Sequence, residues 1–114
     1  MEQLVKAKLL NFLKFKRGWG AMGEGAPFTQ KMVDEILDFF HKHIEGKFES
    51  DVFPGLGGEI MLTLYLENGY YYEIMFEQDG TYSVNIENEK EEEISEEINL
   101  TYKDIVNIVA KLDL

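Results

Sequence analysis

A period of two between residues 60 and 87 constrains the fold of this chain more than any other feature of its sequence. Apolar residues recur at every second position in three short segments, and turn residues separate the segments. The recurring positions are Ile60, Leu62, Leu64 and Leu66, then Tyr70, Tyr72, Ile74 and Phe76, then Tyr82, Val84 and Ile86. Because successive side chains of a β-strand point to opposite faces, this period predicts three strands with one buried face.

The turn residues indicate how these strands pair. A two-residue loop at the first turn would place Leu64 opposite Glu73 and bring a charge to the buried face. A three-residue loop over 67–69, with its glycine in the left-handed conformation of a bulge, instead pairs Leu64 with Tyr72. The same loop at residues 78–80 keeps the apolar positions of the next two strands together. Both turns therefore predict one antiparallel meander.

Three other segments have the spacing of amphipathic helices. Residues 4–15 repeat apolar side chains at helical intervals, and Gly18 favours the end of that helix. Thr29 is a good N-cap for a second helix, whose apolar stripe continues to Gly46. Residues 101–112 carry a third stripe. The sequence thus places two helices before the strands and one after them.

These elements predict an α+β fold. It consists of two N-terminal helices, an antiparallel β-meander of three to four strands, and a C-terminal helix packed on one face of the sheet. The fourth strand is placed at residues 94–100, after an acidic run over residues 88–93. A chain of 114 residues can bury one core and is too short for two. Residues 1–114 are therefore predicted to form a single domain.

The composition argues against several classes of function. The chain has no cysteine, which excludes disulfides, thiolate metal sites and a cysteine nucleophile. Its net charge of −11 argues against nucleic acid as the main ligand, because phosphate binding requires clustered lysine and arginine. The apolar runs are shorter than the roughly 18 residues of a membrane span, so we expect no membrane association and a cytoplasmic location. The acidity either keeps the protein in solution or attracts a basic protein partner.

The segment between the first two predicted helices contains the pattern G-x-G-x-x-G over residues 18–23. Such a pattern binds phosphate when a strand leads into it and a helix follows directly. Here a predicted helix precedes Gly18, and Pro27 intervenes before the next helix. We therefore expect a packed loop anchored by Gly18, Trp19 and Pro27, with phosphate binding as the alternative.

The second predicted helix carries the only two histidines of the chain. Asp38, His41 and Glu45 share one flank of it and are weak candidates for a divalent metal ion. Polar residues must cover the outer flank of any amphipathic helix, so we predict no metal site there. His43 points elsewhere, and no nucleophile with a histidine base can be recognised. We expect neither enzymatic activity nor a cofactor.

The outer face of the predicted sheet is the strongest candidate for a working surface. The register places Met61 opposite Met75 and Tyr65 opposite Tyr71, with Glu73 between the two pairs. Adaptable methionines and amphipathic tyrosines within a polar rim are typical of protein interfaces. The alternative is that another element of the chain, or a second copy, covers this face.

These features predict a non-catalytic protein–protein interaction module. Its partner is either a second copy, giving a homodimer, or a basic protein, as for an antitoxin, immunity or anti-defence protein. The competing hypothesis is a protein that binds a small ligand or a divalent metal ion through the glycine-rich loop or the flank of the second helix.

Several short motifs resemble those of a large family of small, uncharacterised prokaryotic proteins. They are Gly18-Trp19, Ala26-Pro27, Asp51-Val52-Phe53-Pro54, Gly57-Gly58-Glu59-Ile60 and a strand over 72–77 leading to Asp79-Gly80. The family pattern is a Gly-Trp-Asp-Gly-like loop, a helix, a proline before a Gly-Gly strand start, and a hairpin that turns at Asp-Gly. This chain departs from it at Gly20, where an acidic or amide residue is usual, and at Leu64, where a tryptophan is frequent. The resemblance implies a fold and a prokaryotic setting, and it implies no activity.

Overall fold

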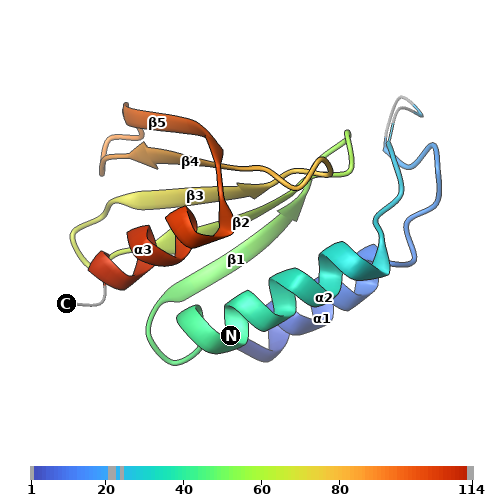
Figure 1. Cartoon of the computed structure of the whole chain (residues 1–114), viewed down its shortest axis with the longest axis horizontal. Helices are drawn as coiled ribbons and strands as arrows, with labels where there is room; N and C mark the ends of the chain where they lie inside the picture. Colours follow the sequence, from blue (N-terminus) through green and yellow to red (C-terminus); the bar gives the residue numbers. More distant parts are fainter. Residues whose placement is uncertain (1, 21–22, 24, 113–114) are drawn as a thin grey trace.

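The computed structural model describes residues 2–20, 23 and 25–112 and shows helices packed against one antiparallel sheet (Figure 1). The helical elements are α1 (Glu2–Phe12), α2 (Gln30–Phe39), the π-helical turn η1 (Phe40–Ile44) and α3 (Tyr102–Leu112). The strands are β1 (Glu49–Pro54), β2 (Ile60–Tyr65), β3 (Tyr71–Phe76), β4 (Tyr82–Glu87) and β5 (Glu93–Leu100). The α+β class predicted from the sequence is confirmed.

The sheet is a five-stranded meander in which every strand pairs with its neighbour in the chain, in the order β1-β2-β3-β4-β5. Leu64 lies opposite Tyr72 and Ile74 lies opposite Val84, so the register predicted for β2, β3 and β4 is confirmed. Gly69 and Gly80 have φ angles of 88° and 87°, the left-handed conformation that the bulged turns require.

The prediction of three to four strands is corrected to five. The additional strand is β1, in which Val52 is the only fully buried apolar residue. A strand with one inward apolar side chain and a terminal proline has no recognisable period of two. The strand placed at residues 94–100 is β5, and it begins one residue earlier.

The two N-terminal helices also differ from the prediction. α1 ends at Phe12 rather than near residue 15. Beyond it the chain tightens, and the Phe15 amide donates to the Phe12 carbonyl over 3.0 Å. In this turn the centroid of the Phe15 ring lies 5.5 Å from that of the Phe12 ring and 4.9 Å from that of the Trp19 ring. Aromatic packing therefore ends the regular helix before Gly18.

The second helix does not continue in α-geometry to Gly46. α2 ends at Phe39, and in η1 the Glu45 amide donates to the Phe40 carbonyl, five residues earlier, over 2.8 Å. Phe39 and Phe40 are both fully buried. A widened turn of this kind lets two consecutive large side chains face the same core. At the start of the helix, the Met32 amide donates to the Thr29 hydroxyl as an N-cap.

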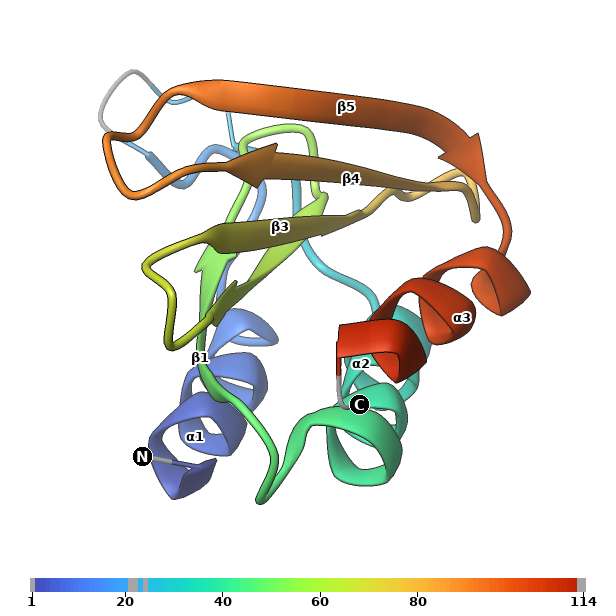
Figure 2. The same cartoon turned by 90° about the vertical axis from the view of Figure 1, so that its left-hand side faces the viewer.

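The core lies between the sheet and the helices (Figure 2). Phe39 of α2 packs 5.7 Å from Phe76 of β3 and 5.9 Å from Tyr102 of α3, measured between ring centroids. Tyr82 of β4 packs against the same Phe76 and donates a hydrogen bond to Glu35 of α2. These contacts join α2 and α3 to the same face of the sheet.

α1 lies alongside β1, the first edge strand of the sheet (Figures 1 and 2). Lys8 of α1 forms an ion pair with Asp51 of β1 over 2.6 Å, and its ammonium group lies 5.0 Å from the ring centroid of Phe53. Lys6 forms an ion pair with Glu45 over 3.0 Å, which links α1 to the residue that follows η1. No helix in the described part of the chain is long and apolar enough to cross a membrane.

Candidate protein-interaction face

The face of the sheet opposite α2 and α3 brings together the side chains that the sequence assigned to an interface. Met61 lies directly opposite Met75, and Tyr65 opposite Tyr71, on the paired strands β2 and β3. The two tyrosine rings meet edge to face, with centroids 5.6 Å apart. All four side chains are half-buried. Burial, and then the charge of Asp51, raise the pKa of the Tyr65 hydroxyl, so this group keeps its proton to a higher pH than a free tyrosine does.

Carboxyl groups lie beside these apolar side chains. Glu73 is paired with Thr63 on one side and Asn85 on the other. Burial raises the pKa of Glu73 to about 7, with a further contribution from its hydrogen bond to Glu87 and from the charge of that residue. Thr63, at the centre of the face, is only 5% exposed. The centre of the face is therefore partly desolvated, which raises the energy of an unpaired charge there.

Asn85 connects these acids to β5. In one orientation its amide nitrogen lies 3.4 Å from Glu73 Oε1. In the other orientation the nitrogen donates to the Ser95 carbonyl and to Glu93 Oε1, each over 3.0 Å. The second orientation is better satisfied because both bonds have ordinary lengths. Glu73, Asn85 and Glu93 thus form a polar row across three neighbouring strands.

The glycine-rich segment folds back on itself and holds the single tryptophan. Trp19 and Gly25 form an antiparallel bridge, in which the Gly25 amide donates to the Trp19 carbonyl over 2.8 Å. The Trp19 indole donates to the Ala26 carbonyl, and its ring packs 5.6 Å from Phe28. Gly18 has a φ of 90°, which favours glycine. Two of the residues in the G-x-G-x-x-G pattern, Ala21 and Met22, lie outside the described residues.

Next to the glycine-rich segment, hydrogen bonds join Ala26 and Pro27 to the β1–β2 turn and to the β3–β4 turn. The Gln78 side chain donates to the Pro27 carbonyl over 3.2 Å and to the Gly58 carbonyl over 3.1 Å. The Ala26 amide donates to the Leu56 carbonyl over 2.8 Å. The β1–β2 turn, the β3–β4 turn and Pro27 are therefore joined by backbone-directed hydrogen bonds.

The polar flank of α2 and η1 is occupied by ion pairs. Lys42 contacts Asp38 over 3.0 Å, and the Nδ1 atom of His41 lies 3.1 Å from Glu45 Oε2. Glu45 also contacts Lys6, as described above. His41 and Glu45 are thus brought together, whereas Asp38 pairs with Lys42 instead. Within the described residues, no group of three or more histidine, aspartate or glutamate side chains is arranged to hold a metal ion.

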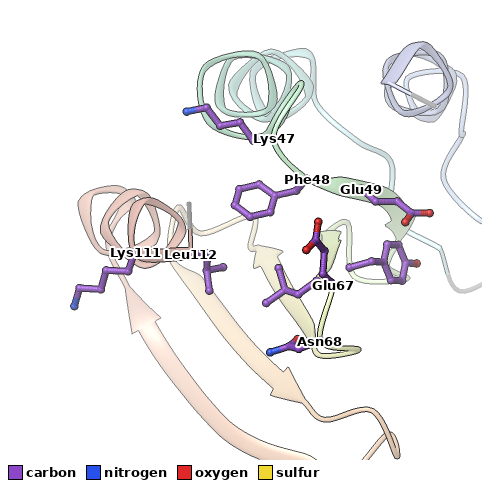
Figure 3. Close-up of a pocket in the computed structure, with 9 residues that line it drawn as sticks. Lys47, Phe48, Glu49, Glu67, Asn68, Lys111 and Leu112 are labelled. Carbon is purple, nitrogen blue, oxygen red and sulfur yellow. The ribbon is translucent and has the colours of Figure 1, made fainter. Parts of the chain in front are cut away.

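An open groove lies at the other end of the sheet, between the connection from η1 to β1, the β2–β3 turn and the end of α3 (Figure 3). Its volume is about 760 Å³. Phe48 and Leu112 face one another across it, while Lys111 points away from its interior. The described lining includes neither the glycine-rich segment nor the flank of η1. The groove therefore does not favour the ligand-binding hypothesis made for those two regions.

The sequence-based view of the interface missed its continuation onto β5. Ile94 and Ile98, which served in the sequence only to place a strand, are 51% and 63% exposed. Glu96 is paired with Asn85 and so lies on the same side of the sheet as Glu73. The acidic residues around both isoleucines are the signal that could have indicated an exposed edge strand.

A scan against protein-family models finds no match for this chain, and searches of the curated proteins and of the solved structures find none either. The resemblance to the family with the Gly-Trp loop therefore stays a prediction.

Proposed function

We propose that this protein is a non-catalytic protein–protein interaction module that binds through the outer face of its sheet. One observation supports this proposal above the others. Met61, Met75, Tyr65 and Tyr71 form two directly opposed pairs on the face that α2 and α3 leave uncovered. Side chains that combine apolar surface with adaptability or a polar tip are enriched at interfaces.

The charge of this face favours a basic partner. Glu73 and Glu87 are close enough to share a hydrogen bond, and the chain as a whole carries a net charge of −11. A lysine or arginine of a partner could replace the shared proton and compensate both carboxylates. This is the chemistry expected of an antitoxin, immunity or anti-defence protein that neutralises a basic protein. Self-association through the same face would bring the carboxyl groups of one copy toward those of the other, which disfavours a homodimer there.

The experiment compares the wild-type protein with the double variant Met61→Asp plus Tyr71→Asp. Sedimentation velocity over a range of concentrations measures self-association, and capture from the source cell, followed by cross-linking to map the contact, identifies partners. The matched control is Gln30→Asp plus Asn107→Asp, two exposed positions on α2 and α3 that give the same change in net charge. If the face is the interface, the first variant loses the complex and the control retains it. An unchanged complex in the first variant would refute the proposal.

A parallel measurement addresses the competing hypothesis. Ligands that bind only the folded state raise the melting temperature in proportion to their saturation. Divalent ions and nucleotides are added separately, and the melting temperature is measured for each. A clear rise would favour a ligand or metal binder over an interaction module.

A further inference from the structure

The two edges of the sheet differ in how they are protected. β1 lies beside α1 and ends in Pro54, which has no amide hydrogen to offer a further strand. β5 is the longest strand, and among the described strands only β4 pairs with it. It forms the free margin of the sheet in Figures 1 and 2. One side of β5 therefore presents backbone donors and acceptors that are available to another strand.

The side chains of β5 are unusually exposed for a strand of this length. Six of its eight residues are exposed, and they include Ile94 and Ile98. Glu96, midway between the isoleucines, pairs with Asn85 of the outer face, and the pairing with β4 shifts register on either side of it, between Glu93 and Ser95 and between Glu97 and Leu100. Ile94 and Ile98 lie at these two irregular positions and add exposed apolar surface to the open edge, next to the outer face.

The charges around this edge indicate which kind of strand could pair with β5. Glu91, Glu92, Glu93, Glu96 and Glu97 lie in or next to β5. Two copies of β5 aligned antiparallel about their centre would place Glu96 of one strand opposite Glu97 of the other. Like charges that face each other across a strand pair are destabilising. The carboxylates therefore disfavour a second copy of the chain and favour a segment that carries positive charge.

From the open backbone, the exposed isoleucines and the acidic flanks, we propose that an extended segment of a partner protein, with lysine or arginine next to apolar residues, adds to the edge of β5 as a further strand. The added backbone would pair with β5, its apolar residues would contact Ile94 and Ile98, and its long cationic side chains would lie near the carboxylates of Glu93, Glu96 and Glu97, which β5 carries on both of its faces. This inference rests on the proposed function, because it names the partner chemistry of the same outer face.

The test uses the whole chain and synthetic peptides with blocked termini. The probe peptide is GKVRVKVRG, and its two controls are GEVEVEVEG, with reversed charge, and GKVRPKVRG, in which a proline interrupts strand pairing. Amide chemical shifts and hydrogen exchange are recorded by NMR for each mixture. We expect the probe to shift the β5 resonances and to protect the β5 amides that do not donate to β4. Equal binding by the proline peptide would show charge attraction alone and would overturn strand addition.

Variants of the chain test the same contact from the other side. Glu96→Lys plus Glu97→Lys is expected to weaken probe binding by about 10-fold, since each reversed charge replaces a modest, solvent-screened attraction with a repulsion. Asp34→Lys plus Asp38→Lys makes the same change in net charge on α2 and is expected to leave the affinity within about 2-fold. Equal weakening by both variants would contradict a site on β5. If the charge-reversed β5 strand fails to fold, the comparison of the two cationic peptides on wild-type protein still decides the question.

The outcome separates this inference from the proposed function. If the probe binds β5 but Met61→Asp plus Tyr71→Asp leaves every complex intact, the edge is a docking strand and the central face is not the interface. If the double variant abolishes complexes and the probe never reaches β5, the face is the interface and strand addition is wrong.

Discussion

The carboxyl groups of Glu73 and Glu87 share a hydrogen bond across neighbouring strands of the outer face, and burial together with this contact raises the pKa of Glu73 to about 7. The ordinary pKa of a glutamate is 4.5, so the folded state holds this proton more tightly than the unfolded chain does. The stability that the proton provides is complete below about pH 4.5 and is lost as the pH rises through 7.

Replacement of this acid by an amide should change that pH dependence. Glu73→Gln is expected to stabilise the protein by about 1 kcal/mol at pH 8 and to have little effect at pH 4, because solvent screening reduces the full value implied by the pKa. Urea unfolding at both pH values measures the difference. Glu67→Gln, on the exposed β2–β3 turn, is the control. If Glu73→Gln changed the free energy of unfolding equally at pH 4 and pH 8, the raised pKa of Glu73 would not be the cause of the pH dependence.

The close contact of Gly25 with Trp19 predicts a substantial loss of stability for Gly25→Ala. A Cβ atom at this position would lie 2.2 Å from the Trp19 carbonyl oxygen and 2.6 Å from its ring. We expect a cost of about 2–3 kcal/mol and a shift in tryptophan fluorescence. At Gly46 an added Cβ atom would meet no atom within 4 Å apart from its chain neighbours, and only the φ of 81° is unfavourable, so Gly46→Ala should cost about 1 kcal/mol. Urea unfolding should rank the two variants in this order, and the reverse order would contradict the packing of the loop.

The hydroxyl of Tyr82 links the sheet to α2 through Glu35. Burial and this hydrogen bond raise the pKa of Tyr82 far above its ordinary value. Tyr82→Phe retains the ring contacts with Phe76 and removes the donor, so we expect a loss of about 1 kcal/mol at pH 7. Tyr70→Phe, at the β2–β3 turn, is the control. Thermal unfolding that shows no difference between the two variants would exclude a contribution from the bond.

The ion pair between Lys8 and Asp51 fixes α1 beside β1. Both side chains are partly exposed, so Lys8→Ala should cost only about 0.5–1 kcal/mol at low salt, and less at 0.5 M salt. Hydrogen exchange of the β1 amides should increase in this variant, because α1 is held less firmly. Lys14→Ala, at an exposed position beyond α1, should leave that exchange unchanged.

The central part of the fold could be predicted because local chemistry determines it. The period of two in β2, β3 and β4 allows one register, since any shift by a residue would bury Glu73 with the core face. β1 could not be predicted, because its place depends on pairing with β2 and on contact with α1. The widened turn at Phe40 likewise depends on the packing of two consecutive rings against the sheet.

Only part of the candidate interface could be predicted from the sequence. The register placed Met61 opposite Met75 and Tyr65 opposite Tyr71 without knowledge of the rest of the molecule. The exposure of Ile94 and Ile98 is indicated only indirectly, by the acidic residues around them, because isoleucines four apart give the same apolar pattern whether the face of the strand is covered or open. The position of β5 at the edge of the sheet distinguishes the two cases.

The connectivity of the sheet also has a kinetic consequence. Since each strand pairs with the next one in the chain, β2 to β5 can assemble hairpin by hairpin, and each hairpin closes a short loop within microseconds. The contacts that join distant parts of the chain, such as Tyr82 with Glu35 and Lys8 with Asp51, form only when the helices arrive. We therefore expect helix docking, rather than strand pairing, to limit the rate at which this protein folds.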